Sequence, residues 1–316
     1  METIAPKIDK NTLKKELAKS LLVRTTNFEN NEIYIFNAHQ CPDLMREVGR
    51  LREISFRASG GGSGKSIDID EYDRMGNPYQ QIIVWNPREE EIIGGYRYFK
   101  LRYAEKNPEG LYKIFTHRKF MPTEKFEKEY MPYTIELGKS FIQPGYQPAN
   151  NPRKGVFSLD NLWDGLGAII VDNPDVRYFY GSVSLYLHYD REARDLLLHF
   201  MNKYFADKDK LVEVRNPQSM TLSQEYLDSF FDGKGFAEDF AQLNKAIRAK
   251  GGSIPPLIKA YMSLSPSMKT FGIARNQDVG DNVEGIGILL TIDDIYPAKK
   301  RRHVESYLNQ KAEKAS

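Results

Sequence analysis

The hydrophobic positions of this chain fall into short runs separated by glycine, proline and asparagine, a pattern typical of β-strands. Two of these runs are joined by Asn86-Pro87-Arg88, a sequence typical of a tight turn. The expected strands are residues 32–36, 80–85, 92–101, 134–142, 178–187, 269–275 and 285–292.

Other segments repeat their apolar residues every three or four positions, the spacing of a helix that buries one face. Leu159, Leu162, Leu166 and Ile170 follow this spacing, and Ser158 before them is a good N-cap. The expected helices are residues 42–56, 158 to the residue before Pro174, 193–205, 236–249 and 256–264. Residues 1–30 are expected to form a helical arm with one apolar face: Leu13, Leu17, Leu21 and Leu22.

The order of these elements predicts a mixed α/β domain, in which a central sheet is flanked by helices. We expect one elaborated domain over residues 31–298, with a helical insertion at about 207–264 and a basic tail at 299–316. The sequence contains neither an internal repeat nor a low-complexity segment.

The strand expected at residues 134–142 is the most informative, because a carboxylate and an ammonium interrupt its apolar pattern. Glu136 and Lys139 lie at odd spacing, which sends side chains to opposite faces of a regular strand, so we predict a nearby β-bulge. Buried charges are costly unless they are paired or used. Two interpretations stay open here: an inward ion pair that sets strand register, or a sheet opened to admit a ligand.

An ordered set of charged and aromatic residues runs along the chain: Arg52, Phe56, Asp70, Asp73, Arg97, Glu136 and Lys139. This set resembles the acyl-homoserine-lactone synthases, in which Arg-x-x-x-Phe, Asp-x-x-Asp, a strand arginine and Glu-x-x-Arg occur in this order. The flanking sequence is more similar to their relatives, the bacterial N-acyltransferases of ornithine-lipid and glycine-lipid synthesis, some of which are labelled haemolysin-like.

Four stretches carry that second resemblance: residues 64–73, 92–97, 136–143 and 254–259. Together they span roughly residues 44–297, and the ordered combination is more specific than any single piece. Two features depart from the lactone-synthase pattern. Lys139 stands where arginine is usual, and the glycine-rich loop lacks a typical tryptophan.

The resemblance implies the GNAT acyltransferase fold, in which the fourth and fifth strands diverge and hold an acyl thioester between them. Here those strands would be residues 134–142 and 178–187. It also implies transfer of a long fatty acyl group, with or without a 3-hydroxyl, from acyl carrier protein to a small amino acid. Glycine is the first expected acceptor and ornithine the second. The donor and partner is then acyl carrier protein, and no cofactor is expected to be bound.

Two other function classes remain open from the sequence. One is an acetyltransferase that acts on small molecules with acetyl-coenzyme A, and a strict requirement for a fatty acyl carrier would exclude it. The other is a non-catalytic acyl-binding or membrane-associated protein that has kept the fold.

The resemblance also implies roles for individual residues. Glu136 is the candidate base, directly or through water, and Lys139 either neutralises it or faces the carrier protein. Arg97 either holds the carboxylate of the amino acid or is locked to Asp70 or Asp73. Backbone N–H groups at the bulged strand are expected to stabilise the oxyanion.

The substrate pocket is expected to contain Arg52, Phe56, Asp70, Asp73, Ser140 and Phe141. The candidates for an apolar acyl groove are Phe141, Trp163, Phe179 and Leu185. Arg153, Lys154 and Gly155 precede the helix expected from Ser158, and helix N-termini attract anions. These three residues are therefore the candidates for binding the phosphate of a phosphopantetheine arm.

Composition narrows the function classes further. The 316 residues are 41% hydrophobic and 12% aromatic, enough for one elaborated globular domain, and a net charge of +2 argues against bulk nucleic-acid binding. The single cysteine, Cys41, excludes an intramolecular disulfide and fits a reducing cytoplasm. No apolar run approaches the ~20 residues of a membrane span. We therefore expect a cytoplasmic protein, with peripheral contact at the inner face of the membrane as a further expectation.

Three motifs invite other interpretations. Residues 60–66 look like a phosphate-binding loop, but the glycine that this motif requires is replaced by Ser59, so a mobile lid is the better interpretation. The acidic residues of 68–73 lack the pattern of a calcium loop, and no His/Cys/Asp constellation suggests a metal. For the basic run at 299–303, a solvated tail is the favoured interpretation. The alternative is contact with anionic lipid or an acidic carrier protein.

Overall fold

A mixed sheet of eight strands forms the centre of the computed structural model, which describes residues 1–231, 235–275 and 283–315. In spatial order the strands are β1 (Leu21–Thr25), β2 (Glu32–Phe36), β3 (Gln80–Asn86), β4 (Glu91–Lys100), β6 (Thr134–Ile142), β7 (Tyr178–Tyr186), β10 (Val283–Thr291) and β9 (Lys269–Arg275). Neighbouring strands are antiparallel except for β6 and β7, which are parallel. The predicted α/β class is confirmed.

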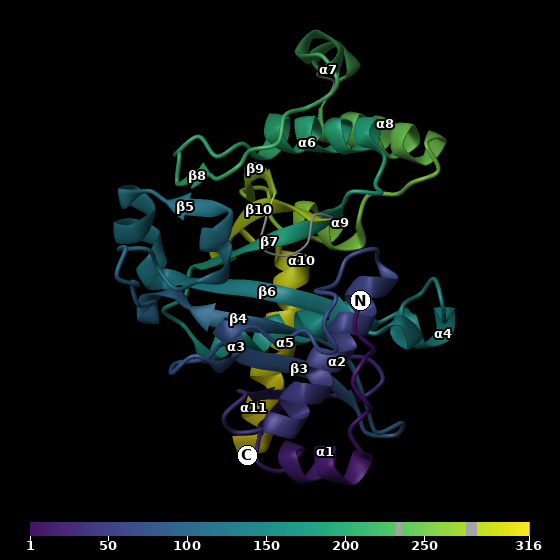
Figure 1. Ribbon diagram of the computed structural model, residues 1–316, viewed down its shortest axis with the longest axis vertical. Helices are drawn as coiled ribbons and strands as arrows, with labels where there is room; N and C mark the ends of the chain where they lie inside the picture. Colours follow the sequence, from purple (N-terminus) through teal and green to yellow (C-terminus); the bar gives the residue numbers. More distant parts are fainter. Residues whose placement is uncertain (232–234, 276–282, 316) are drawn as a thin grey trace.

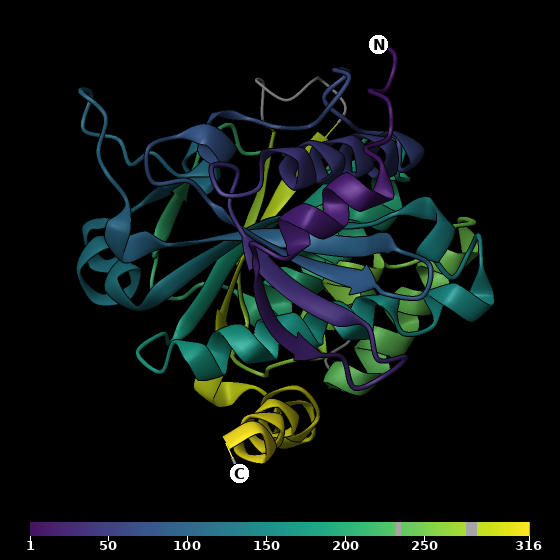
Figure 2. The same ribbon diagram turned by 90° about the horizontal axis from the view of Figure 1, so that it is seen from below.

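Helices cover both faces of the sheet. Helices α1 (Lys10–Leu17) and α2 (Pro42–Ala58) lie on one face, and α5 (Ser158–Asp172) lies on the other (Figure 2). Strand β3 shows why both faces are apolar. Ile83 and Trp85 pack with the residues of α2, while Ile82 and Val84 pack with those of α5, because successive side chains of a strand alternate between faces.

Further elements extend the sheet at its β9 end and around its rim. Helices α6 (Arg191–Phe205), α7 (Gln224–Phe230) and α8 (Phe236–Ala249) gather at one end of the molecule (Figure 1). The remaining elements are α3 (Glu71–Arg74), α4 (Pro152–Gly155), α9 (Pro256–Met262), α10 (Pro297–Lys300), α11 (Ser306–Ala315), and the short pair β5 (Phe120–Pro122) and β8 (Val212–Val214). The segment expected as a helical insertion contains α7, α8 and α9, but β8 and α7 were not predicted.

The N-terminal segment differs from the predicted helical arm. The helix ends at Leu17, and the chain continues as β1, an edge strand that pairs with β2. Leu13 and Leu17 are buried, whereas Leu21 is 61% exposed. The spacing of the leucines is helical throughout, but the open edge of β2 supplies a hydrogen-bonded ladder that local periodicity does not reveal.

The C-terminal segment is likewise not a solvated tail. It forms α10, a π-helical turn over Arg301–Glu305, and α11, and it packs against α5. Arg302, His303 and Lys311 contact a stripe of aspartates on α5: Asp160, Asp164 and Asp172. His303 is 5% exposed, and its Nδ1 lies 2.8 Å from Oδ1 of Asp164. Arg302 and His303 of the basic run thus contact acidic residues of the same chain, and the segment is docked on α5.

Candidate active site

The sheet opens between β6 and β7. These strands pair only from Thr134 opposite Tyr178 to Leu137 opposite Gly181. Beyond that point β6 pairs only with β4, and β7 pairs only with β10. The divergence that the resemblance implied for these two strands is therefore present.

A β-bulge lies at the point of divergence. Two steps along β4, from Gly95 to Arg97, correspond to three steps along β6, from Phe141 to Gly138. Lys139 lies in the bulge with a φ of 51°, a left-handed conformation uncommon for residues other than glycine. The predicted bulge is confirmed. It directs the Lys139 ammonium to Asp68, whose two carboxylate oxygens lie 2.7 and 2.9 Å from Nζ.

Three adjoining cavities surround the bulge. The first, which we call the chamber, is a cavity of about 250 Å³ between the loop after α2, strand β7 and the start of α9. The chamber has several polar lining residues: Ser63, Asp68, Lys119, Lys139, Ser140, Ser182 and Ser184. The second, which we call the slot, is a narrow space of about 30 Å³ between β6 and β7. It shares Lys139, Ser140 and Ser182 with the chamber.

The slot and the third cavity differ in chemistry. The slot has a largely apolar lining: Leu137, Phe179, Ile288 and Leu290, together with Val183 and Leu257, which also line the chamber. The third cavity, which we call the vestibule, has a volume of about 400 Å³ and many charged lining residues: Lys65, Asp68, Asp70, Glu71, Arg74 and Arg118. It shares Asp68, Phe115 and Lys139 with the chamber. A charged approach and an apolar slot therefore meet at the bulge.

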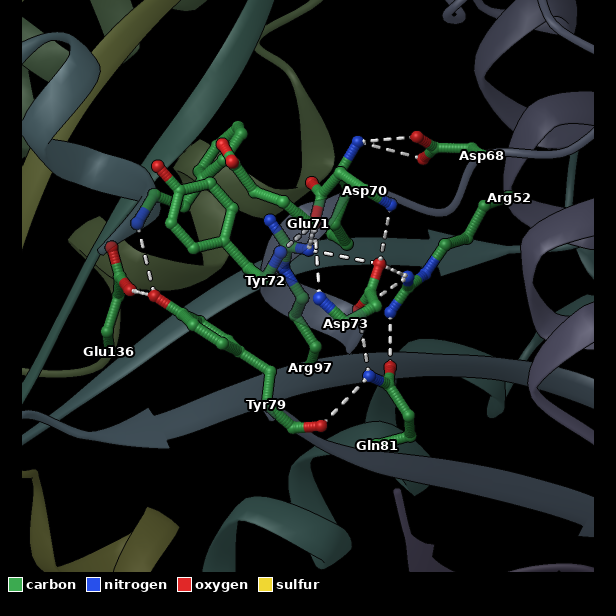
Figure 3. Close-up of polar contacts among 12 residues, drawn as sticks. Arg52, Asp68, Asp70, Glu71, Tyr72, Asp73, Tyr79, Gln81, Arg97 and Glu136 are labelled. Atoms are coloured by element: carbon green, nitrogen blue, oxygen red, sulfur yellow. Dashed lines mark hydrogen bonds and ion pairs between the residues drawn. The ribbon is translucent and has the colours of Figure 1, made fainter. Parts of the chain in front are cut away.

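Glu136 lies outside these cavities, in the buried layer between the sheet and residues 115–117. It is 1% exposed; the backbone N–H of Thr116 donates to it at 2.7 Å, and the Tyr79 hydroxyl donates to its other oxygen (Figure 3). Burial raises the pKa of Glu136, although these hydrogen bonds oppose the rise. Of the alternatives left open for Glu136 and Lys139, the ion pair between them does not form, because the bulge turns Lys139 toward Asp68. The role of Glu136 as base stays a prediction.

Arg97 belongs to a closed network of charges. Its Nη1 lies 2.6 Å from Asp70 and 3.2 Å from Asp73, and Arg52 lies 3.3 Å from Asp73 (Figure 3). Gln81 completes the network by donating to Asp73. Burial alone would raise the pKa of Asp70, but Arg97 holds it below its usual value. Of the two alternatives for Arg97, the structure shows the one in which both aspartates lock it, and the guanidinium is fully buried.

The same aspartates shape the turn that leads into β3. Asp70 caps the short helix α3 by accepting from Tyr72 and Asp73, and the Asp73 carboxylate accepts from the Asp70 backbone. The two aspartates thus pair with both Arg52 and Arg97. Its local effect is to hold α3 beside the vestibule.

The remaining predicted pocket residues divide into two groups. Phe56 and Ser140 line the chamber, and Phe179 lines the slot. Phe141 points to the α2 face, where it packs in the core with Trp85 and Ile92. Its assignment to the pocket is wrong, because residues after the bulge alternate from a shifted position.

The other two groove candidates also lie elsewhere. Trp163 on α5 packs edge-on against Tyr261 at 5.6 Å between ring centroids, and Leu185 is a buried residue of the α5-side core. Neither residue lines the slot or the chamber.

Arg153, Lys154 and Gly155 form part of α4 rather than the approach to a helix N-terminus. The predicted N-cap Ser158 lies inside α5, whose N-cap is Phe157. Lys154 lies 3.2 Å from Glu89, and Gly155 is packed so closely that a Cβ would lie 2.4 Å from the Pro148 nitrogen. None of the three lines the chamber, the slot or the vestibule. Phosphate binding by this segment stays a prediction.

The glycine-rich loop closes one side of the chamber through Gly62 and Ser63. Glu53 of α2 accepts from the backbone N–H groups of Ser63 and Gly64 at 2.8 and 2.9 Å. Gly62 has a φ of 96°, a conformation that disfavours residues with a side chain. The loop is therefore a wall anchored to α2 in this structure.

Several residues of the site were missed from the sequence. Tyr79 and Thr116 hold Glu136, and Lys119 and Ser182 line the chamber. Asp68 was noticed only as part of an acidic cluster. Lys119 lies in a stretch, residues 101–133, without clear periodicity, and no local signal marks it as buried.

Among the described residues, no cluster of three or more His, Cys, Asp or Glu side chains is arranged to hold a metal ion. The described part of the chain also contains no helix both long and apolar enough to cross a membrane. Cys41 is buried at the start of α2, and burial raises the pKa of its thiol to about 11, consistent with a structural role.

The divergent parallel strands within a mixed sheet define the class of this protein: it is an acyltransferase of the GNAT type. Residues 51–153 match the family described as acetyltransferase (GNAT) domain. The chain is 48% identical over 313 residues to a glycine N(alpha)-acyltransferase of Phocaeicola vulgatus, covering 99% of this chain and 96% of the relative. A glycine N(alpha)-acyltransferase of Bacteroides thetaiotaomicron is also 48% identical over 308 residues, covering 98% of this chain and 91% of the relative.

The chain therefore belongs to the family of GNAT-like N-acyltransferases that contains these two proteins. Among solved structures, a CoA-dependent acyl-homoserine lactone synthase is similar at 12% identity and a TM-score of 0.30, covering 52% of this chain and 72% of that chain. The expected enzymatic function is confirmed, and the non-catalytic alternative is set aside.

Proposed function

We propose that this acyltransferase moves a long fatty acyl group from the thioester of acyl carrier protein to the amine of glycine, with ornithine as the second candidate acceptor. The observation that carries the proposal is the meeting of an apolar slot and a charged vestibule at Lys139, which lines both. The near full-length identity to two glycine N(alpha)-acyltransferases supports glycine as the acceptor.

The slot is the proposed site of the part of the acyl chain next to the thioester, since its volume of about 30 Å³ is too small for a whole long chain. Leu137 and Phe179 line it from β6 and β7, and Ile288 and Leu290 line it from β10. Burial of hydrocarbon against such side chains contributes roughly 25 cal/mol per Å² of apolar surface. A charged or nucleotide group would gain nothing from this lining, so the slot favours a fatty acyl group over a polar one.

The vestibule is the proposed path of the amino acid. Its lining carries both signs of charge, from Lys65 and Arg118 on one hand and Asp70 and Glu71 on the other. An amino acid carries both charges at neutral pH and keeps its polar contacts along such a path. It would reach the chamber past Phe115 and Lys139, which line both cavities.

The reaction has three requirements. The ammonium of the amino acid loses a proton, the amine then attacks the thioester carbonyl, and the carbon–sulfur bond breaks as the amide forms and the thiolate accepts a proton. Donors must stabilise the oxyanion formed between these events, and the backbone of β6 and β7 beyond Leu137 and Gly181, where the strands no longer pair, is the proposed source.

Glu136 is the proposed base, acting through water because its carboxylate lines none of the cavities. Its raised pKa makes it a better proton acceptor than an ordinary carboxylate. Asp68 faces the chamber directly, but both of its oxygens are bonded to Lys139.

Purified protein assayed with three donors tests the proposal: palmitoyl-acyl carrier protein, palmitoyl-coenzyme A and acetyl-coenzyme A, each with glycine or ornithine. We expect the highest kcat/KM with the acyl carrier protein and glycine, and unchanged turnover after chelation with EDTA. Exclusive use of acetyl-coenzyme A would support the small-molecule acetyltransferase instead. Mass spectrometry of lipids from expressing cells should then show a new N-acylglycine.

A further inference from the structure

Lys119 is a buried cation that has no matching anion among the residues that the structure describes. Its side chain lies at the floor of the chamber and is 5% exposed as a residue. Its Nζ lies 3.3 Å from the Ser182 hydroxyl oxygen, a neutral partner. Within the described residues no carboxylate lies within 4.0 Å of this nitrogen, whereas the neighbouring Lys139 is paired with Asp68 at 2.7 Å. A buried ammonium in this state costs stability unless a ligand supplies the anion.

The surroundings of Lys119 add positive charge rather than remove it. The ammonium groups of Lys119 and Lys139 both lie 5.7 Å from the ring centroid of Phe115, and Arg118 lies 5.9 Å from it. Burial first, and then the charges of Lys139 and Arg118, lower the pKa of Lys119 to about 8. An anion bound in the chamber would stabilise the charged form of Lys119, since its negative charge would offset the cost of burial and oppose the two cations.

A glycine in the next strand leaves room for this ammonium. A Cβ at Gly285 of β10 would lie 2.4 Å from Lys119 Nζ and 2.5 Å from Ser182 Oγ. Gly285 lies opposite Ser184 of β7, so the space that it leaves open belongs to the wall of the chamber. Glycine at position 285 thus leaves space for the Lys119 ammonium, which a side chain at that position would displace.

We propose that Lys119 binds the carboxylate of the acceptor amino acid, with the Ser182 hydroxyl beside it. The inference rests on the proposed function, in which an amino acid and an acyl thioester meet in the chamber. A carboxylate held at Lys119 places the amine toward the slot, because Ser182 and Lys139 line both spaces. The thioester itself is neutral, so it does not supply the missing anion.

The test compares glycine with glycinamide, which has the same amine but no carboxylate. The variants are Lys119→Met, Lys119→Arg and, as a matched control, Lys125→Met, whose exposed lysine pairs with Asp209. A lost hydrogen bond to a charged group corresponds to a decrease of about 10- to 100-fold, so we expect kcat/KM for glycine to fall by that factor in Lys119→Met, mainly through KM. With glycinamide, Lys119→Met should stay close to wild type, and Lys119→Arg should recover part of the loss with glycine.

Gly285→Ala supplies a second, independent variant. The added Cβ meets the flexible end of the lysine, so the fold should persist while the ammonium is displaced. We expect a smaller rise in KM for glycine than in Lys119→Met, and again no change with glycinamide. These measurements are made with the full-length protein and palmitoyl-acyl carrier protein at saturation.

Each contrary outcome has a defined meaning. Equal losses with glycine and glycinamide would overturn the carboxylate assignment and indicate a role in the oxyanion step. A rise confined to KM for the acyl carrier protein would also overturn it, in favour of donor binding. If wild-type protein acylates neither acceptor from any donor, the proposed function fails, and this inference fails with it.

Discussion

Two buried clusters of charged residues lie against the aromatic ring of Phe115, and they differ in the ratio of cations to carboxylates. On one side Arg97 and Arg52 meet Asp70 and Asp73, so two cations face two carboxylates. On the other side Lys139 is paired with Asp68, and Lys119 has no carboxylate within 4.0 Å among the described residues. The first cluster balances its own charges, with Asp70 at the edge of the vestibule, whereas all three residues of the second cluster line the chamber.

The difference separates a structural role from a functional one. A compensated network satisfies its own charges, so it contributes rigidity and offers no free charge to a ligand. An uncompensated cation beside a cavity is costly in the empty protein and is used when an anion binds. Both clusters contain residues that a motif search would group together. The number of carboxylates available to each cation distinguishes the two clusters.

The largest effect should come from breaking the closed cluster. Asp73→Asn leaves Arg52 and Arg97 buried with one carboxylate, and removing one partner of a buried ion pair costs roughly 3–5 kcal/mol of unfolding free energy. Urea unfolding followed by circular dichroism measures this loss. Asp209→Asn, which breaks exposed pairs with Lys125 and Lys269, is the control and should change stability little. Equal stabilities for the two variants would contradict the structural role.

Glu136 tests a third case, a buried carboxylate with neutral partners only. Glu136→Gln keeps the shape and can still accept from Thr116 or Tyr79, so the melting temperature should hold. If Glu136 is the base, kcat falls by about 10²–10⁴. Rate and melting temperature are measured on one purified sample.

The comparison for this variant is Asp68→Asn, which leaves the ammonium of Lys139 without its carboxylate. That variant should lose stability as well as rate. A lowered melting temperature for Glu136→Gln, with the specific activity of the folded fraction retained, would remove Glu136 from the mechanism.

The open cluster makes an opposite prediction about stability: Lys119→Met should make the free protein more stable. The pKa of Lys119 is lowered from 10.5 to about 8 by burial and by Lys139 and Arg118, which corresponds to at most about 3 kcal/mol. Below pH 8 Lys119 is protonated in both the folded and the unfolded chain, so the full cost of burying its charge lowers the stability. Between pH 8 and 10.5 the unfolded chain binds more protons, so wild-type stability rises with pH.

The difference in unfolding free energy between Lys119→Met and the wild type should therefore decrease across that pH range. Unfolding midpoints at several pH values between 7 and 10.5 measure it, with Lys125→Met as the control. A gap that stays constant with pH would show that the empty protein already neutralises Lys119.

The smallest structural effect is expected at α4. Arg153→Ala with Lys154→Ala removes exposed side chains, and such substitutions usually change stability by less than about 0.5 kcal/mol. If this segment contacts the donor, KM for acyl carrier protein should rise, more at low salt than at high salt. An unchanged KM at low salt would show that donor binding does not involve α4.

Much of the fold follows from the sequence alone. β2, β6, β9 and α8 have the predicted bounds, because their apolar patterns are long and are bounded by turn residues. The bulge in β6 was also predictable, since two charges at odd spacing cannot share one face of a regular strand. The pairing of Asp70 and Asp73 with arginines followed from the resemblance to a family.

Other features depended on contacts between distant segments. The leucine pattern of the N-terminal arm continues into β1, and only the open edge of β2 decides that this part is a strand. The basic tail becomes a docked helix because α5 presents aspartates at matching intervals. In both cases the local sequence pattern is compatible with two structures, and contact with the neighbouring element determines which one forms.

The sequence by itself determined the order of most elements and, through its resemblance to a family, the divergence of β6 and β7. Tertiary structure alone decided which of the two lysines at the chamber has a carboxylate partner. Lys139 turns from Glu136 to Asp68 because of the bulge, and Lys119 from an unpatterned stretch meets β7 and β10 without an anion. Compensation of charge depends on distances between segments far apart in the chain, and no spacing along the sequence encodes those distances.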